Sequence, residues 1–280
     1  MLNSTVLEVA IGLVFCFASI SLIASSINEA VASALKLRGR TLLTGIKSLL
    51  NDPQFTGLAQ AIYNHALINP QGAGHAKSQA ELTTKPSYIP SKQFAIALVD
   101  VLQTAPGSVQ HFEHALNSVK DHQLRTMLLG MFQRASGDVE KMQAELAAWF
   151  DNSMERVAGG YKRRSQLICF IIALIVTALF NVDSFRVFET LWIHPALTAQ
   201  LSLAQNPDLT TTITELKLLP VGWEQAPEFS LLSKPTWVMF TGWLVTASSA
   251  LFGAPFWFDL LQKMTRLRGT GKKPEKADAT

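Results

Sequence analysis

The sequence predicts an all-α membrane protein with three transmembrane helices and a helical cytoplasmic domain inserted between the first and second spans. Charged residues make up only 16% of the 280 residues, whereas soluble proteins average about 25%. The deficit is concentrated in three windows that are almost free of charge, and the longest stretch between them has apolar residues at helical spacing. This distribution indicates membrane spans combined with a helical domain outside the bilayer.

The first predicted span occupies residues 1–27. Its core, AIGLVFCFASISLIASSI, carries no charge and is close to the length of about 20 residues that crosses a bilayer as a helix. A cleaved signal peptide would carry basic residues before the apolar run. Residues 1–8 contain no Lys or Arg and include Glu8, so we expect a retained anchor.

The second and third predicted spans occupy residues 166–188 and 236–258. The second contains the most hydrophobic run of the chain, LICFIIALIVTALFNV. The third has tryptophans toward its ends, as interfacial anchors do, and it contains Pro255. Because proline removes one backbone hydrogen bond, we expect a kink there.

Lys and Arg residues are distributed unevenly around these spans. Residues 28–165 carry 15 of the 24, residues 183–235 carry three, and the tail 259–280 carries six. The positive-inside rule therefore places the N-terminus outside, residues 28–165 in the cytoplasm, the loop 189–235 outside, and the basic tail in the cytoplasm. The loop contains a possible strand at 211–219, and the end of the tail is expected to be disordered.

The cytoplasmic segment is predicted to be helical throughout, apart from a Pro- and Gly-containing loop at 68–91 that is too long for a plain connector. A helix that continued from 138 to 182 would form a rod of about 67 Å, with Gly159-Gly160 either a hinge or a helix end. The helix expected at 28–50 is basic, and it either lies on anionic headgroups or packs on its own domain. The expected helices are 28–50, 54–67, 92–104, 108–118, 121–135 and one that starts at 136–138.

No catalytic motif is present, so we predict no catalytic residues, no cofactor, no metal and no enzyme activity. The net charge of +3 does not indicate nucleic-acid binding. His111 and His114 share a helix face and could meet a metal, with Glu113 and His122 nearby, but a surface helix is the simpler interpretation. Both cysteines, Cys16 and Cys169, are interpreted as packing residues.

Two sets of polar or small residues lie in or beside the predicted spans. Asn181, Asp183 and Arg186 gather at the outer end of the second span, where ionisable groups are functional candidates if they are buried and cost little if they lie in the interface. A stripe of small residues runs along the third span and predicts close helix packing, with a polar lining for an ion path as the alternative. The stripe comprises Gly242, Thr246, Ser249 and Gly253.

Two stretches, WFDNSMERVAGGYKRRSQ at 149–166 and FGAPFWFDLLQKMTRLRGTGKKP at 252–274, resemble motifs of a group of uncharacterised bacterial inner-membrane proteins. The resemblance implies a bacterial inner membrane and the three-span topology, and it assigns no activity. The topology is also similar to that of ExbB/TolQ/MotA-like proton-channel subunits, although no motif of theirs matches.

The leading functional hypothesis is a membrane-anchored scaffold or interaction protein that oligomerises through its spans and presents its cytoplasmic helices to a partner. The alternative is a subunit of an oligomeric ion channel or signal transducer. A membrane hydrolase would require Asp151, Glu155 and Asp259 to converge. We expect the candidate site at the inner membrane boundary, where two groups of residues are predicted to touch: Trp149, Asp151, Glu155, Arg156, Tyr161, Arg163 and Arg164 in the first, and Pro255, Trp257 and Asp259 in the second.

Overall fold

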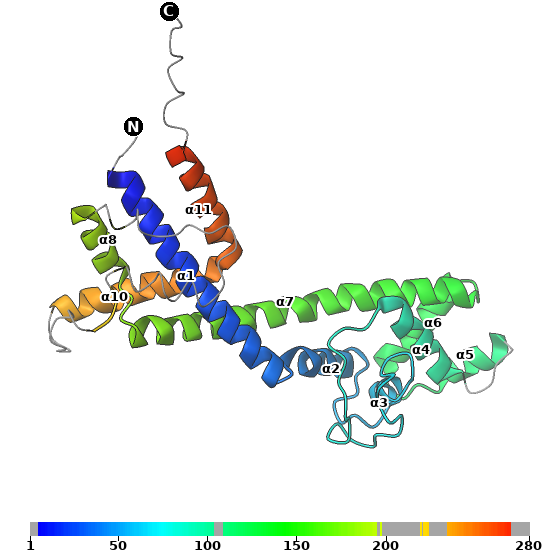
Figure 1. The fold of residues 1–280 in the computed structure, drawn as a ribbon. Helices are drawn as coiled ribbons and strands as arrows, with labels where there is room; N and C mark the ends of the chain where they lie inside the picture. Colours follow the sequence, from blue (N-terminus) through cyan, green and yellow to red (C-terminus); the bar gives the residue numbers. More distant parts are fainter. Residues whose placement is uncertain are drawn as a thin grey trace, which may run out of the picture. The chain divides into compact units, whose positions relative to one another are not determined.

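The computed structural model describes residues 5–103, 109–194, 197, 219, 221–223 and 234–269. The described residues form helices and no strand, which confirms the all-α prediction (Figure 1). The possible strand at 211–219 and the end of the basic tail fall almost entirely outside the described residues. The helices are α1 (Thr5–Ala34), α2 (Leu37–Leu49), α3 (Leu58–Tyr63), α4 (Ser91–Leu102), α5 (Val109–Asn117), α6 (His122–Arg134), α7 (Val139–Leu179), α8 (Ser184–Ile193), α10 (Lys234–Ser249), the short 3₁₀ helix η2 (Ala250–Phe252) and α11 (Ala254–Gly269).

The chain divides into two compact units. The central unit is residues 32–163, and the split unit combines residues 1–31 with 164–280. Two long helices, α1 and α7, contribute residues to both units.

Aromatic stacking organises the core of the central unit. Phe94 of α4 stacks on Phe150 of α7 with ring centroids 4.2 Å apart, and Phe112 of α5 meets Phe132 of α6 edge-on at 5.5 Å. These four rings are almost fully buried. Burial of such large apolar side chains is the main stabilising contribution to a helical domain of this size.

Helix ends in the central unit differ from the predicted ones in two places. The expected continuous helix at 28–50 is interrupted at Lys36, which adopts a left-handed conformation (φ 50°) between α1 and α2. The expected helix at 54–67 shortens to α3, because the Asp52 carboxylate holds the preceding turn. The Asp52 carboxylate accepts hydrogen bonds from the backbone N–H groups of Thr56 (2.9 Å) and Gly57 (2.8 Å).

The long loop before α4 is held by two asparagine side chains. Asn64 binds the backbone of Ala76 twice, accepting from its N–H and donating to its carbonyl, both at 2.9 Å. Asn69 accepts from the Thr84 hydroxyl at 2.6 Å. Side-chain amides replace the backbone ladder that a loop lacks, so this segment has a defined path despite its glycines and prolines.

α7 continues through Gly159-Gly160 without a break, as Figure 1 shows, and its 41 residues extend for about 61 Å. A Cβ atom added at either glycine would meet nothing within 4 Å. The predicted rod is therefore present from Val139 to Leu179, and neither glycine is needed for packing.

Both later span windows contain a bend. The helix pair Val139–Leu179 and Ser184–Ile193 bends by 53°, and the pair Thr236–Phe252 and Ala254–Arg266 bends by 95°. The expected kink at Pro255 is instead a full break at Gly253, whose φ of 81° is accessible to glycine at no steric cost. By length and composition, α1 is suited to cross a membrane, and up to three crossings are available if each bent pair counts as one.

Candidate functional site

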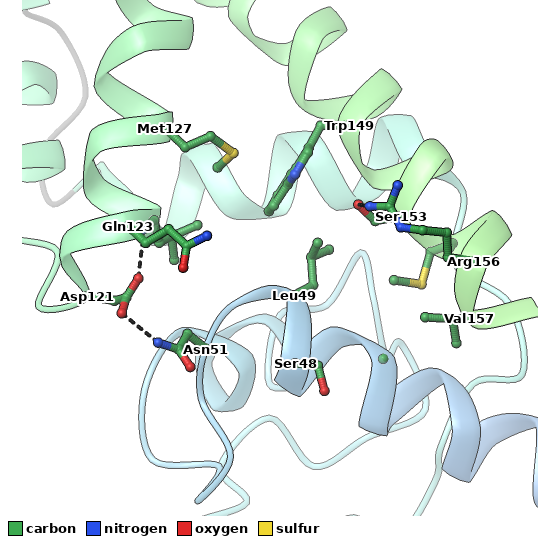
Figure 2. Close-up of a pocket in the computed structure, with 13 residues that line it drawn as sticks. Ser48, Leu49, Asn51, Asp121, Gln123, Met127, Trp149, Ser153, Arg156 and Val157 are labelled. Carbon is green, nitrogen blue, oxygen red and sulfur yellow. Dashed lines mark hydrogen bonds between the residues drawn. The ribbon is translucent and has the colours of Figure 1, made fainter. Parts of the chain in front are cut away.

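An open cleft in the central unit brings together α2, the start of α6 and α7. Its volume is about 670 Å³, inside the range of roughly 300–1,000 Å³ that is typical of binding pockets. Figure 2 shows the side chains that surround it. We call it the Trp149 cleft, and it is lined by Gly45, Ser48, Leu49, Asn51, Asp121, Gln123, Leu124, Met127, Trp149, Ser153, Met154, Arg156 and Val157.

A close crossing of α2 and α7 forms one end of this cleft. A Cβ atom on Gly45 would lie 2.9 Å from both methyl groups of Val157, so only glycine allows the two helices to approach this closely. Both residues line the cleft. The spacing of its walls is therefore fixed by the packing of the central unit.

Trp149 is the largest apolar side chain of the cleft. Its indole lies 6.5 Å from the Phe94 ring, which is itself stacked on Phe150. One side of the indole is therefore held by the core, while the side chain also lines the open space, as Leu49 and Met127 do (Figure 2). Tryptophan is enriched among the residues that dominate binding energies, and methionine adapts to irregular apolar partners.

The polar rim of the cleft is organised by Asp121. Its carboxylate accepts from the Leu124 N–H at 2.7 Å, which caps the start of α6, and from the Asn51 side-chain amide at 2.6 Å (Figure 2). The Leu124 hydrogen bond and then the Asn51 amide hold the pKa of Asp121 below its ordinary value, because both interactions favour the charged form. The rim thus carries a fixed negative charge, with Arg156 close to Ser153 (3.3 Å) on the α7 wall.

A second groove involves the same part of α7. Its volume is about 480 Å³, and we call it the Tyr161 groove. The exposed carboxylates of Asp151 and Glu155 line it, together with Arg38 of α2 and Tyr88 of the loop. Residues 149–161 of α7 therefore contribute to two concave surfaces of the central unit.

The first predicted group of site residues is distributed over these two surfaces. Trp149 and Arg156 line the Trp149 cleft, whereas Asp151, Glu155 and Tyr161 line the Tyr161 groove. Arg163 and Arg164 are exposed at the boundary between the units.

The second predicted group belongs to the split unit. Trp257 of α11 is half-buried and donates from Nε1 to the Ser249 carbonyl at 2.7 Å, whereas Pro255 and Asp259 are exposed. Because the two groups lie in different units, their predicted contact stays a prediction.

The sequence reasoning missed the walls from α2 and α6. Asp121 had a usable signal, because Asp is a favoured residue immediately before a helix. Leu49, Asn51 and Met127 had none, since nothing local marks them as neighbours of Trp149.

Polar side chains hold the break between α7 and α8 in the split unit. Asn181 donates to the Gly222 carbonyl at 2.8 Å and accepts from the Trp243 indole at 3.1 Å. Ser184 donates to the Gly242 carbonyl at 3.2 Å. These bonds satisfy polar groups in an apolar setting, where an unsatisfied group is costly. Of the predicted cluster, Asn181 and Asp183 are therefore buried against α10, whereas Arg186 is half-buried and donates to the Gly222 carbonyl at 3.1 Å.

The predicted small-residue stripe has three different local roles. Gly242 leaves room for the Asp183 carboxylate, which a Cβ atom would overlap. Thr246 and Ser249 are buried and donate to carbonyls of their own helix, those of Gly242 and Thr246. Gly253 forms the break before α11, where it adopts a positive φ. The close helix packing predicted for the stripe stays a prediction.

Among the residues with described side chains, no three His, Cys, Asp or Glu are grouped closely enough to hold a metal ion. The predicted pair of His111 and His114 lies partly outside them, since the His111 side chain is not among the described ones. Comparisons with protein-family models, with curated proteins and with solved structures find no match.

Proposed function

We propose that the chain is a membrane-anchored interaction protein whose central unit binds a partner in the Trp149 cleft. One observation carries this proposal: a concave surface with a core-anchored tryptophan, two methionines and a fixed acidic rim lies outside the three apolar windows of the sequence. Flexible apolar side chains around a rigid aromatic are typical of surfaces that accept an apolar helix face. The partner proposed for the cleft is therefore a helical protein segment with an apolar face.

The membrane part of the proposal has three crossings. They are α1, the apolar end of α7, and α10 with η2. The last pair is about 30 Å long, which matches the thickness of the hydrocarbon core. The distribution of Lys and Arg supports an outer N-terminus, a cytoplasmic central unit and a cytoplasmic tail. The membrane proposed is a bacterial inner membrane, as the resemblance of residues 149–166 and 252–274 implies.

In this arrangement α8 lies in the outer interface. One face of α8 is buried through Val187 and Leu191, and the adjoining face exposes Phe188 and Trp192, whose rings stack at 5.7 Å. Exposed aromatic rings beside a span are typical of the membrane–water interface. The 53° bend after α7 is what allows α8 to leave the direction of the span.

The binding proposal is tested by the mass of the detergent-solubilised complex, compared between wild type and Trp149→Ala. Wild type is expected to carry a partner or further copies of the chain, and Trp149→Ala to lose the partner. Tyr88→Ala, which removes an exposed aromatic of the Tyr161 groove, is the matched control and should keep it. A complex unaffected by Trp149→Ala contradicts the proposal.

The topology is tested separately with a reporter fused after Thr280. A cytoplasmic signal is expected, and an extracytoplasmic one contradicts the three-crossing arrangement. Homo-oligomerisation through the spans remains part of the proposal, and the same mass measurement determines its stoichiometry.

A further inference from the structure

A further concave surface of the central unit lies between the residue before α2, the loop that follows α3 and the first turn of α4. Its volume is about 590 Å³, and we call it the Lys85 pocket. Lys36 and Lys85 line it, and none of its lining residues, all of which lie in the described part of the chain, is Asp or Glu. A concave surface lined by one sign of charge concentrates ions of the opposite sign, so this pocket favours an anion.

The walls of the Lys85 pocket are held by hydrogen bonds within the unit. Buried Asn69 links two of them, because besides accepting from the Thr84 hydroxyl it donates to the Thr84 carbonyl at 3.3 Å. His65 holds the start of the wall after α3. Its Nδ1 accepts from the Leu67 N–H at 3.3 Å, and its Nε2 lies 3.4 Å from the Asp100 carboxylate. The pocket is therefore formed before any ligand arrives, and Asp100 of α4 is already engaged by His65.

A close approach of the loop to α2 brings the two lysines to the same pocket. A Cβ atom on Gly39 would lie 2.7 Å from the Lys85 carbonyl oxygen and 3.2 Å from the Lys85 Cβ, so only glycine allows this contact. Lys36 precedes Gly39 by three residues, which is about one helical turn. Among the described side chains, no carboxylate pairs with Lys36 or Lys85.

Lys36 also has an unusual backbone conformation. Its φ of 50° and ψ of 41° are left-handed, which glycine or asparagine would adopt at a lower steric cost. Strained residues of other types gather at functional sites. The charge of Lys36 therefore has a use that its backbone position alone does not explain.

Exposed apolar side chains stand beside the two cations. Tyr88 and Leu67 line the pocket, and their exposed fractions are 76% and 40%. The volume lies within the range of small-molecule sites, roughly 300–1,000 Å³, and exceeds the need of a bare inorganic anion. The complementary ligand therefore has an anionic group joined to an apolar or flat body.

We propose that the Lys85 pocket binds a small phosphate monoester, with its phosphate between Lys36 and Lys85 and its body against Tyr88 and Leu67. A phosphate monoester carries about two negative charges at pH 7, which matches two lysines, and lysine is a common phosphate-binding residue. The proposal goes beyond the Trp149 cleft and depends on neither the protein partner nor the membrane topology. The same phosphate chemistry is available from a soluble molecule and from a lipid headgroup.

The test uses the full chain in phosphatidylcholine nanodiscs, titrated calorimetrically with inorganic phosphate or phenyl phosphate at constant ionic strength. Wild type is expected to bind both, and phenyl phosphate more tightly. Lys36→Asn removes the charge and suits the left-handed backbone, so it should weaken the binding of inorganic phosphate about fivefold without lowering the melting temperature. Lys85→Gln should weaken it by a similar factor, whereas Lys36→Arg should keep it.

Three further variants make the result specific. Lys120→Asn and Lys141→Gln remove the same charge from exposed positions elsewhere in the central unit and should leave the affinity unchanged. Tyr88→Ala should leave the affinity for inorganic phosphate unchanged and abolish the preference for phenyl phosphate, because it removes an apolar contact and no charge.

A second set of nanodiscs containing phosphatidic acid identifies the source of the phosphate. Weaker apparent binding of phenyl phosphate in these discs, with no such difference in Lys36→Asn, would identify a lipid headgroup as the ligand. Equal binding in both sets would identify a soluble phosphate monoester. Both outcomes support the phosphate site.

Four results would overturn the proposal. They are an absence of phosphate binding in wild type, unchanged binding in Lys36→Asn/Lys85→Gln, an equal loss in the Lys120→Asn control, or a preference for phenyl phosphate that persists in Tyr88→Ala. A failed Trp149→Ala test or a failed topology test would leave this proposal standing.

Discussion

Asp52 is the residue on which the start of α3 depends. It is buried, and besides Thr56 and Gly57 its carboxylate accepts from the Ala59 N–H at 3.1 Å. The sequence predicted a helix from residue 54 and not the turn that comes before α3. That turn arises because a single carboxylate satisfies several successive N–H groups, which local propensity does not reveal.

Asp52→Asn should destabilise the central unit by about 1–2 kcal/mol, because the charged acceptor of several N–H groups is lost while its shape is kept. Hydrogen exchange of the amides in 56–63 measures the effect and should accelerate. Glu113→Gln, at an exposed position on α5, is the control and should leave these amides unchanged. Equal protection in Asp52→Asn and wild type would contradict the assigned role.

Gly242 shows how one pattern can hide different roles. The sequence grouped it with Gly253, because both lie on one face at helical spacing. In the structure Gly242 faces Asp183, which is far away in sequence, and Gly253 needs a positive φ. Neither the long-range contact nor the backbone conformation is encoded in the spacing.

Gly242→Ala should lower the melting temperature of the solubilised protein, because the methyl group would overlap the Asp183 carboxylate. Overpacking of this kind costs about 1–3 kcal/mol. Gly130→Ala is a control in the central unit, where the nearest atom is the flexible end of Arg134 at 3.3 Å. Melting temperatures equal to that of wild type in both variants would contradict the contact between Gly242 of α10 and Asp183 at the α7–α8 break.

At the level of the helices, apolar periodicity predicted the existence of most elements, because each helix buries one face against a shared core. It did not predict the break within the third apolar window. Pro255 is the second residue of α11, where its missing N–H has no helical partner to lose. The break falls two residues before it, at Gly253, which adopts a positive φ.

The glycine pair of α7 provides a test at this level. Because added Cβ atoms would meet nothing within 4 Å, Gly159→Ala and Gly160→Ala should each stabilise α7 by up to about 1 kcal/mol. Amide exchange across 155–165 should slow. Faster exchange would show that the glycines are required for packing, and loss of partner binding without destabilisation would instead support the hinge interpretation.

The start of α6 should be sensitive to acid. The pKa of Asp121 is lowered in the folded chain from its ordinary value of 3.8. The unfolded state therefore binds the proton more readily, and the stabilisation is present above about pH 4 and lost as the pH falls through the folded pKa. Wild type should lose thermal stability over that acidic range more steeply than Asp121→Asn. Parallel pH profiles would contradict the assigned cap.

For the whole molecule, charge and hydropathy predicted a helical segment outside the apolar windows but not its concave surfaces. The walls of the Trp149 cleft come from residues 45–51, 121–127 and 149–157, which are separate in sequence. Only tertiary packing, including the approach of α2 to α7 at Gly45, brings them together. The sequence therefore indicated the α7 wall alone.

A photo-crosslinker placed inside the Trp149 cleft measures whether the cleft receives a protein partner. Benzoylphenylalanine replaces Met127, which lines the cleft. In the control it replaces Gln133, which is exposed on the same helix. In intact cells, irradiation should yield one discrete adduct from position 127, none of that mass from 133, and none from 127 in the Trp149→Ala background. No adduct at 127, or the same adduct from both positions, would contradict the account.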